Sequence, residues 1–282
     1  MEKWSFFIKK EKKVQFAAIF LSGTGTNAEA ILKHLAENSV EELVISVLIT
    51  DRPETSKAAE IAQIYDIPVI EHSVKELYKA HGMESTSLKT ERGREIRELW
   101  TNELRQKLST YSIDFAIFAG FTLLTNITSD YLCLNVHPGD LSYLKDGQRY
   151  LIGMHNIPIE RAILEGHSDL RSSVILAEPY AGEGANMDSG LILSLSPKVS
   201  IDLQEHSLEN LQSIYDERVP GSRIDDPLRD IARENLDRLK THGDWVVFPK
   251  TVVDFAKGHY AIDGDRQLHF YENNDWQAVK LK

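Results

Sequence analysis

Asn135 and His137, which are separated by one residue, are the pair of side chains with the clearest chemical potential. The apolar run 115–120 has the length and turn ending of a buried parallel strand, and 131–134 is predicted to form a second short strand. Ligands of open α/β sheets bind beyond the carboxyl ends of strands, where we expect both side chains on one side of an extended segment. An amide donor beside an imidazole suits an oxyanion and a proton in transit. The alternative is a strand end whose polar groups bond to turn backbone.

A glycine-rich turn, 22–27, separates the apolar run 15–21 from a helical pattern at 28–35. Its glycines permit close backbone approach, and the free N–H groups at a helix start favour an anion. The sequence therefore predicts a phosphate site here, with Thr26 or Asn27 capping the helix. A plain turn with a good cap is the alternative.

The elements that position these residues alternate between strands and helices, which predicts a parallel sheet with helices on both faces. The predicted order is strand 15–21, helix 28–35, strand 44–50, helix 54–65, strand 67–70, helix 91–108, strand 115–119, strand 131–134, helix 159–164, strands 172–177 and 191–196, and helices 206–217 and 227–241. The fold class is therefore α/β and Rossmann-like.

The chain is predicted to hold one α/β domain over 1–257 and a C-terminal β-hairpin extension over 258–282. Residues 259–280 are typical of a small antiparallel unit, with turns at Asp263-Gly264 and Asn273-Asn274. Residues 4–8 are predicted to form an extra edge strand ahead of the first core strand.

Composition narrows the class of protein. The hydrophobic content of 42% and charged content of 27% over 282 residues are ordinary for a soluble globular protein. A net charge of −11 argues against a general nucleic-acid binder, and no apolar run is long enough to span a membrane. The one cysteine, Cys133, excludes an internal disulfide and a multi-cysteine zinc site. We therefore expect a cytoplasmic protein with neither nucleic-acid nor membrane partners.

Four motifs occur in one order: Ser-Gly-x-Gly-x-Asn at 22–27, Ala-Gly-Phe at 119–121, Asn-x-His-Pro at 135–138 and Asp-x-Gly at 188–190. Together they resemble the formyl-tetrahydrofolate-dependent formyltransferases over roughly residues 15–257. Within that family the resemblance is closest to the phosphoribosylglycinamide formyltransferase branch, and methionyl-tRNA formyltransferase is a relative.

The resemblance implies a catalytic trio of Asn135, His137 and Asp188. The substrate amine would attack the formyl carbon directly, giving a tetrahedral intermediate with neither a covalent enzyme adduct nor a metal. Asn135 would donate to the oxyanion, and His137 would stabilise its charge and relay a proton towards the folate nitrogen. Asp188 would orient His137 or a water molecule.

The resemblance also implies which residues bind the two substrates. Backbone amides of the glycine turn would hold the acceptor phosphate: Gly23, Thr24, Gly25, Thr26 and Asn27. Asp244, ahead of Phe248-Pro249, matches a residue that contacts the ribose. Formyl-tetrahydrofolate, as co-substrate, would lie against Phe121, Thr122, Leu123, Gly184 and Asn186.

The implied activity is formyl transfer to the amine of a small phosphorylated acceptor in one-carbon metabolism. Glycinamide ribonucleotide, a precursor in purine biosynthesis, is the leading candidate. The chain departs from the family pattern at Thr122-Leu123, at 139–141 and in the long segment 142–155, which leaves the acceptor open. A sugar nucleotide or methionyl-tRNA is a possible acceptor, and the choice between monomer and homodimer is open.

Three other functions compete with this interpretation. Gly23-x-Gly25-x-x-Ala28 fits a dinucleotide fingerprint with Asp51 as the ribose acid, which predicts an NAD-dependent oxidoreductase. That interpretation leaves the trio without a role. A hydrolase could release formate from the same folate, because water can replace the amine. A formyltransferase-like binding protein without turnover is the third alternative.

Overall fold

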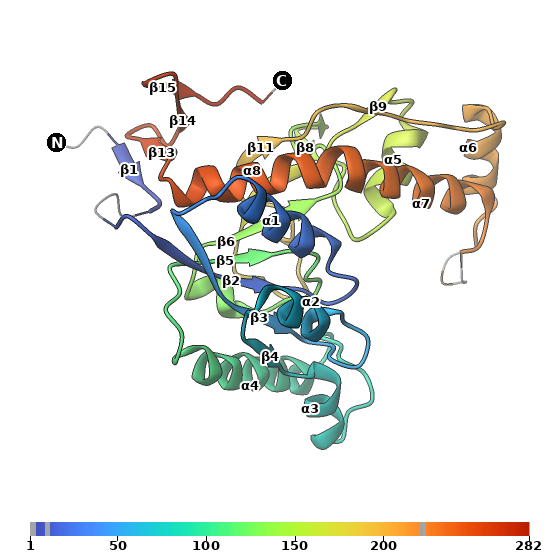
Figure 1. Cartoon of the computed structure of the whole chain (residues 1–282). Coiled ribbons are helices and arrows are strands. Elements are labelled where there is room, and N and C mark those ends of the chain that lie inside the picture. The colour runs from blue at the N-terminus through green and yellow to red at the C-terminus, as the bar shows by residue number, and fades with distance from the viewer. Residues whose placement is uncertain (1–3, 9–11, 220, 222–223, 282) are drawn as a thin grey trace.

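A seven-stranded sheet lies at the centre of the protein (Figure 1). The computed structural model describes residues 4–8, 12–219, 221 and 224–281. The sheet order is β11-β10-β6-β5-β2-β3-β4. The bounds are β2 (Gln15–Phe20), β3 (Leu43–Thr50), β4 (Val69–Glu71), β5 (Phe115–Phe118), β6 (Cys133–His137), β10 (Ser173–Ala177) and β11 (Ile192–Leu195). Strands β2 to β6 are parallel, whereas β10 runs antiparallel to both β6 and β11. The predicted mainly parallel, Rossmann-like sheet is confirmed.

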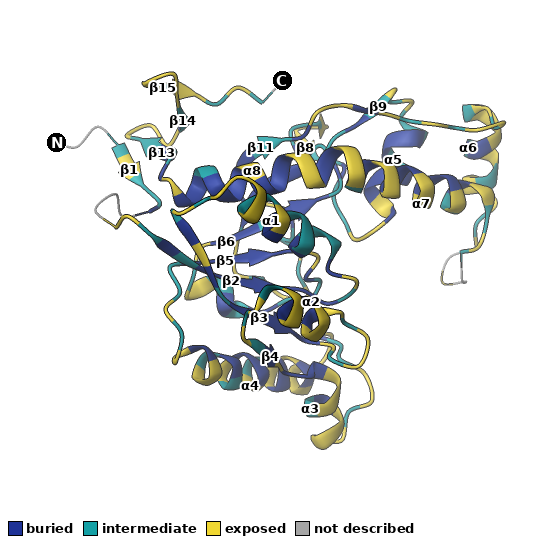
Figure 2. Ribbon diagram, in the orientation of Figure 1, coloured by how far each residue is buried: buried dark blue, intermediate teal, exposed yellow. Residues whose placement is uncertain are grey.

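Helices cover both faces of this sheet because its strands are apolar on both sides, as buried parallel strands are. In β2, Ala17 and Ile19 contribute to one core cluster, and Ala18 and Phe20 to the other. The first face carries α1 (Thr26–Glu37), α2 (Ala58–Tyr65) and α8 (Trp245–Ala256). The second carries α3 (Val74–Ala80) and α4 (Glu91–Leu108). Figure 2 shows the sheet buried between these layers.

A third apolar cluster joins α5 (Ile157–Leu164), α6 (Leu208–Asp216) and α7 (Pro227–Leu239) beside the sheet. Buried Glu160 of α5 pairs there with Arg218 and Arg229. The smaller elements nearby are η1 (Asn126–Ser129), the strand pair β9 (Asp169–Leu170) with β12 (Val199–Ser200), and the strand pair β7 (Leu144–Lys145) with β8 (Gln148–Arg149). The β7–β8 hairpin lies within the long segment 142–155.

A π-helical turn, η2 (Lys240–Asp244), joins α7 to α8 (Figure 1). The predicted helix 227–241 is therefore confirmed, but helical structure continues to Ala256. This continuation was not predicted because Pro249, which has no N–H for the helical hydrogen bonds, is untypical of a helix interior. Widened π turns of this kind are frequent at functional sites.

Strand β1 (Trp4–Phe6) does not join the central sheet, so the predicted edge strand is wrong. It pairs instead with β13 (Tyr260–Asp263), followed by β14 (Leu268–Glu272) and β15 (Asp275–Ala278), in a four-stranded antiparallel sheet. Figure 1 shows this sheet at the end of α8. The predicted C-terminal antiparallel element is confirmed, whereas the division into domains at 257/258 stays a prediction.

Candidate active site

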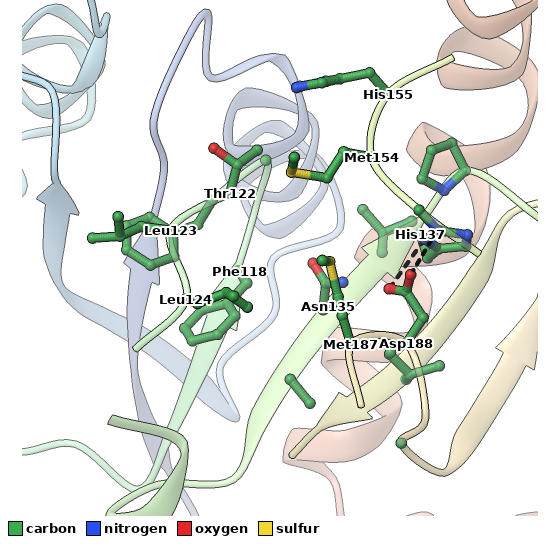
Figure 3. A pocket seen from close by; sticks show the side chains of 18 of the residues that line it. Phe118, Thr122, Leu123, Leu124, Asn135, His137, Met154, His155, Met187 and Asp188 are labelled. Carbon is green, nitrogen blue, oxygen red and sulfur yellow. Dashed lines mark hydrogen bonds and ion pairs between the residues drawn. The ribbon is translucent and has the colours of Figure 1, made fainter. Parts of the chain in front are cut away.

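A pocket of about 240 Å³ opens at the carboxyl ends of β5 and β6. Asn135, His137 and Asp188 all line it, although Asp188 lies far from the other two in the sequence. Figure 3 shows their side chains gathered on one side of the pocket. The structure therefore brings together the three residues expected to carry the chemistry.

Asn135 and His137 lie within β6 and not beyond its end, so the predicted strand 131–134 was placed too early. The reason is β10, which pairs antiparallel with β6 and extends the ladder as far as the His137–Ser173 pair. Residues two apart in a strand share a face. Both side chains accordingly reach the same pocket, as the sequence predicted.

Both ring nitrogens of His137 face hydrogen-bond acceptors. Nε2 donates to the carbonyl oxygen of Leu151 at 2.7 Å, and Nδ1 lies 3.2 Å from Oδ1 of Asp188. The His137 side chain is only 3% exposed, and that of Asp188 is 4% exposed. A ring with N–H groups at both nitrogens satisfies both acceptors and carries a positive charge. The geometry thus supplies a buried histidine–aspartate pair beside Asn135.

Gly139 allows the Leu151 carbonyl to approach His137. A Cβ at position 139 would lie 2.5 Å from the Leu151 oxygen and 2.9 Å from Nε2 of His137. Atoms at these separations overlap, so a side chain here would separate the two groups. One departure from the family pattern, Gly139, is therefore linked to another, the long segment 142–155.

Asp188 is held as a carboxylate by its neighbours. Its backbone is left-handed, with φ at 65°, and its Oδ2 accepts a hydrogen bond from the Gly153 N–H at 3.1 Å. Burial raises the pKa of Asp188, but the bond from His137, the charge of His137 and the Gly153 N–H more than offset burial. The resulting pKa lies below its ordinary value.

The depressed pKa of Asp188 predicts a sensitivity to acid. An aspartate with a lower pKa in the folded than in the unfolded chain stabilises the fold above the unfolded value, and this contribution disappears as the pH falls through the folded value. We expect the Tm of the wild type to fall more steeply than that of Asp188→Asn between roughly pH 5 and pH 2. Thermal unfolding followed by circular dichroism measures both curves. Parallel curves would contradict the depressed pKa.

Asn135 presents its amide to the pocket. Within the part of the chain that the structure describes, this side chain makes no hydrogen bond, and it is half-buried. Figure 3 shows it on the side of the pocket where His137 and Asp188 also lie. Its N–H groups are therefore available to a carbonyl or oxyanion that enters beside His137.

The glycine turn leaves the start of α1 open. The residue before the helix is Gly25, with φ at 71°, and no side chain of the described residues caps it. The expectation that Thr26 or Asn27 caps this helix is wrong, because both lie inside its first turn. Their backbone N–H groups point out of the helix start without a helical partner, as an anion site requires.

Asp244 lies in the π turn at the base of the pocket and is 4% exposed. Its carboxylate accepts hydrogen bonds from Ser172 Oγ at 2.5 Å and from Asn27 Nδ2 at 3.2 Å. Burial raises the pKa of Asp244, and the bonds from Ser172 and Asn27 oppose that shift. In this structure Asp244 therefore orients Asn27, while Lys240 from the same turn also lines the pocket.

The residues expected to bind folate differ from one another in their contacts. Phe121, Thr122 and Leu123 line the pocket, although the ring of Phe121 mostly packs in the core beside Phe20, Phe118 and Trp100. Asn186 also lines the pocket. Its amide, however, bonds to the backbone of Ala181 and Pro179, so it orders its own loop.

Gly184 is not among the pocket-lining residues, but it supports the pocket wall. A Cβ on Gly184, where φ is 98°, would lie 2.5 Å from Cδ1 of Leu124. Leu124 does line the pocket. A side chain at position 184 would therefore change the pocket by displacing Leu124.

Sequence reasoning missed several residues that line this pocket: Leu124, Met154, His155, Tyr180, Met187 and Lys240. Figure 3 shows Met154 and His155 on the side opposite the Met187–Asp188 segment. Met187 could have been predicted, because it directly precedes Asp188 of the Asp-x-Gly motif. No sequence pattern pointed to Met154 or Lys240. Met154 follows a hairpin that was not predicted, and Lys240 lies in a π turn that was not predicted.

Asp51 is fully buried at the end of β3, so it cannot hold the ribose of a dinucleotide. Burial is the main cause of its raised pKa, with Ser22 and Arg52 opposing that shift. The dinucleotide interpretation thereby loses its acidic residue. Over the described residues, no group of three or more His, Cys, Asp or Glu side chains has the arrangement of a metal site.

Solved structures whose names state reactions of formyl groups share this fold over nearly the whole chain. The phosphoribosylglycinamide formyltransferase from Anaplasma phagocytophilum is 19% identical, with a TM-score of 0.60 over 93% of this chain and 97% of that one. Glycinamide ribonucleotide transformylase 1 from Symbiobacterium toebii is 17% identical, with a TM-score of 0.59 over 96% and 100%.

A third solved structure differs in the reaction that its name states. The formyltetrahydrofolate deformylase from Burkholderia mallei is 14% identical, with a TM-score of 0.54 over 92% of this chain and 70% of that one. No family model matches the sequence, and no curated protein matches it. At these identities the likeness establishes the fold that the chain shares with phosphoribosylglycinamide formyltransferases, and the chemistry must be argued from the pocket.

Proposed function

We propose that the protein is a formyltransferase that moves a formyl group from formyl-tetrahydrofolate to the amine of a small phosphorylated acceptor. Glycinamide ribonucleotide is the leading acceptor, which would place the enzyme in purine biosynthesis. The observation that carries the proposal is the His137–Asp188 pair, 3.2 Å apart, next to an unpartnered Asn135 amide in one pocket. The fold shared with solved formyl-group enzymes supports it.

The geometry suggests how the groups act. The amine nitrogen attacks the formyl carbon, a C–N bond forms, and the carbonyl oxygen becomes an oxyanion. Asn135 donates to that oxygen, and the ring of His137, when protonated at both nitrogens, stabilises its charge at short range. The amine proton passes to the folate nitrogen, by way of Asp188 or a water molecule, as the bond from carbon to folate breaks.

The phosphate of the acceptor is assigned to the open start of α1. The backbone N–H groups of the turn at 23–27 provide hydrogen bonds, and the helix dipole favours a negative charge. Of this turn, only Asn27 lines the pocket, where Lys240, which is bonded to Asp237, supplies a cation. Because Asp244 is already bonded to Ser172 and Asn27, its contact with a ribose stays a prediction.

Gly25→Ala is expected to weaken acceptor binding selectively. A Cβ there would lie 2.4 Å from Cδ1 of Ile61, and φ is +71°. The αL conformation costs a non-glycine residue roughly 1–2 kcal/mol, so the turn should shift and misplace its N–H groups. Steady-state kinetics should show KM rising at least several-fold for the acceptor and little for folate. Gly82→Ala, with φ at +76° and open space around it, is the matched control. Equal effects on both KM values would contradict the assignment.

Hydrolysis is the second candidate function, because one solved relative in fold is a formyltetrahydrofolate deformylase. Water would then take the place of the amine at the formyl carbon. The open helix start favours the transferase, since a hydrolase needs no phosphate site.

The deciding experiment follows formyl-tetrahydrofolate spectroscopically with and without glycinamide ribonucleotide. Turnover that depends on the acceptor establishes the transferase and its substrate together. Consumption without acceptor supports the hydrolase. Binding without turnover indicates another amine, which sugar nucleotides and methionyl-tRNA would test, or a silent site. Failure to bind folate would refute the proposal.

We place the protein in the cytoplasm as part of this proposal, since folate and its acceptors are small soluble metabolites. No helix within the described ranges has the length and apolar character needed to cross a membrane.

A further inference from the structure

The segment that carries Asp188 is built from turns joined by short-range hydrogen bonds. It connects β10 to β11 without a helix or strand, and Gly182 and Gly184 adopt positive φ values. Asn186 ties the first part of the loop together through Ala181 and Pro179. A turn bond from the Ser189 N–H to the Asn186 oxygen spans Asp188, which holds a left-handed φ of 65°. His137 and the Gly153 N–H hold the carboxylate itself, so the remaining question is which side chain holds the backbone of Asp188 and Gly190.

The side chain of Arg149 holds this stretch of backbone. It is the last residue of β8, and its Nη1 donates to the carbonyl oxygens of both Asp188 and Gly190, the latter at 2.9 Å. One guanidinium nitrogen thereby closes a turn of three residues, with Ser189 between the two carbonyls. A Cβ on Gly190 would lie 1.8 Å from the Leu176 oxygen, so the turn is also pressed against β10.

The chain that follows Arg149 contacts the same pair of catalytic groups. The Leu151 carbonyl accepts from His137, and the Gly153 N–H donates to Asp188. Residues 149–153 thus bond to the backbone of the Asp188 turn, to its carboxylate and to its imidazole partner. All three contacts come from the end of the long segment 142–155, whose role the sequence left open.

We propose that Arg149 is a positioning residue that holds Asp188 in its left-handed conformation against His137 and couples the β7–β8 hairpin to the catalytic pair. Its kinetic consequence rests on the proposed function, whereas its effect on the loop does not. Arg149 acts through two backbone carbonyls and does not line the pocket.

The conformation of Asp188 explains why the loss of Arg149 should matter. Aspartate tolerates the left-handed region better than most residues, but that conformation still costs up to about 1–2 kcal/mol, so Asp188 is expected to relax when its backbone is released. Displacement of a catalytic group by about 1 Å can cost on the order of 100-fold in rate. Lysine would keep a positive charge near Asp188 and Glu178 but lacks the planar fork that spans two carbonyls.

The test compares Arg149→Met and Arg149→Lys with the wild type and with Arg233→Met, an exposed arginine of α7, as control. Hydrogen–deuterium exchange of the peptide 178–191 reports on the turn independently of any activity. We expect both Arg149 variants to exchange at least 10-fold faster there, with other peptides and the control unchanged. Unchanged exchange in 178–191 would overturn the proposal.

Kinetics then separate positioning from a merely structural role. We expect kcat to fall about 10- to 100-fold in both variants with little change in either KM. The acid limb of the kcat profile should move to higher pH in Arg149→Met only, because the neighbouring charges on Asp188 are His137 and Arg149. Faster exchange with unchanged kcat would overturn the positioning role. If the wild type shows no formyl transfer, the proposed function fails while the exchange result still decides whether Arg149 ties the turn.

Discussion

Asp188→Asn is expected to lower kcat by about 100- to 10,000-fold with little change in the KM for folate. The Gly153 N–H needs an acceptor, so the asparagine oxygen would turn towards it and the NH₂ group would face His137. Nδ1 of His137 must then accept, and the ring keeps only the proton that it donates to Leu151. The pocket would hold nearly the same shape but lose the charge that stabilises the oxyanion.

His137→Ala should cause a loss of similar size by removing the ring altogether. Circular dichroism and Tm must first show that both variants fold. Asp146→Asn, an exposed position in the turn of the β7–β8 hairpin with φ at 53°, is the matched control and should retain wild-type turnover. Near-normal kcat in both His137→Ala and Asp188→Asn would refute the assignment of the catalytic trio.

Gly139→Ala is expected to impair both stability and catalysis. The added Cβ would meet the Leu151 oxygen at 2.5 Å, Nε2 of His137 at 2.9 Å and Pro158 at 3.1 Å. Overpacking of this kind costs typically 1–3 kcal/mol of unfolding free energy. Because relief of the contact separates Leu151 from His137, we also expect kcat to fall at least about 10-fold.

Chemical denaturation and steady-state kinetics measure the two effects of Gly139→Ala. Gly264→Ala is the control, since a Cβ there has nothing within 4 Å and the position lies in the turn between β13 and β14. Its unfolding free energy should change by less than about 0.5 kcal/mol. If Gly139→Ala matches this control in both measurements, the close approach of Leu151 to His137 contributes to neither stability nor catalysis.

The sequence predicted the central sheet well because its signals are local. Buried strands such as 115–118 are short apolar runs, and the helix 91–108 begins and ends where its pattern does. The four ordered motifs were enough to gather Asn135, His137 and Asp188 on one pocket, which no periodicity could have done. Their catalytic roles stay predictions until turnover is measured.

What the sequence could not predict depends on contacts between distant residues. Strand β1 pairs with β13, more than 250 residues further along the chain, and no local sequence pattern predicts that partner. The hydrogen bond from His137 to the Leu151 carbonyl depends on the path of the backbone through the β7–β8 hairpin, which only three-dimensional packing determines. Likewise, the buried carboxylate of Asp244 became a partner of Ser172 and Asn27 through the π turn.

The pairing of Trp4 with Asp263 also has a consequence for synthesis of the chain on the ribosome. Strands β2 to β6 can assemble once residue 137 has emerged, but residues 4–6 must wait for almost the whole chain before their partner exists. Translation at about 5–20 residues per second makes that delay on the order of ten seconds or more. During this interval Trp4 and Phe6 lack the strand that pairs with them, so a nascent chain stalled before residue 260 offers an unpaired edge to chaperones.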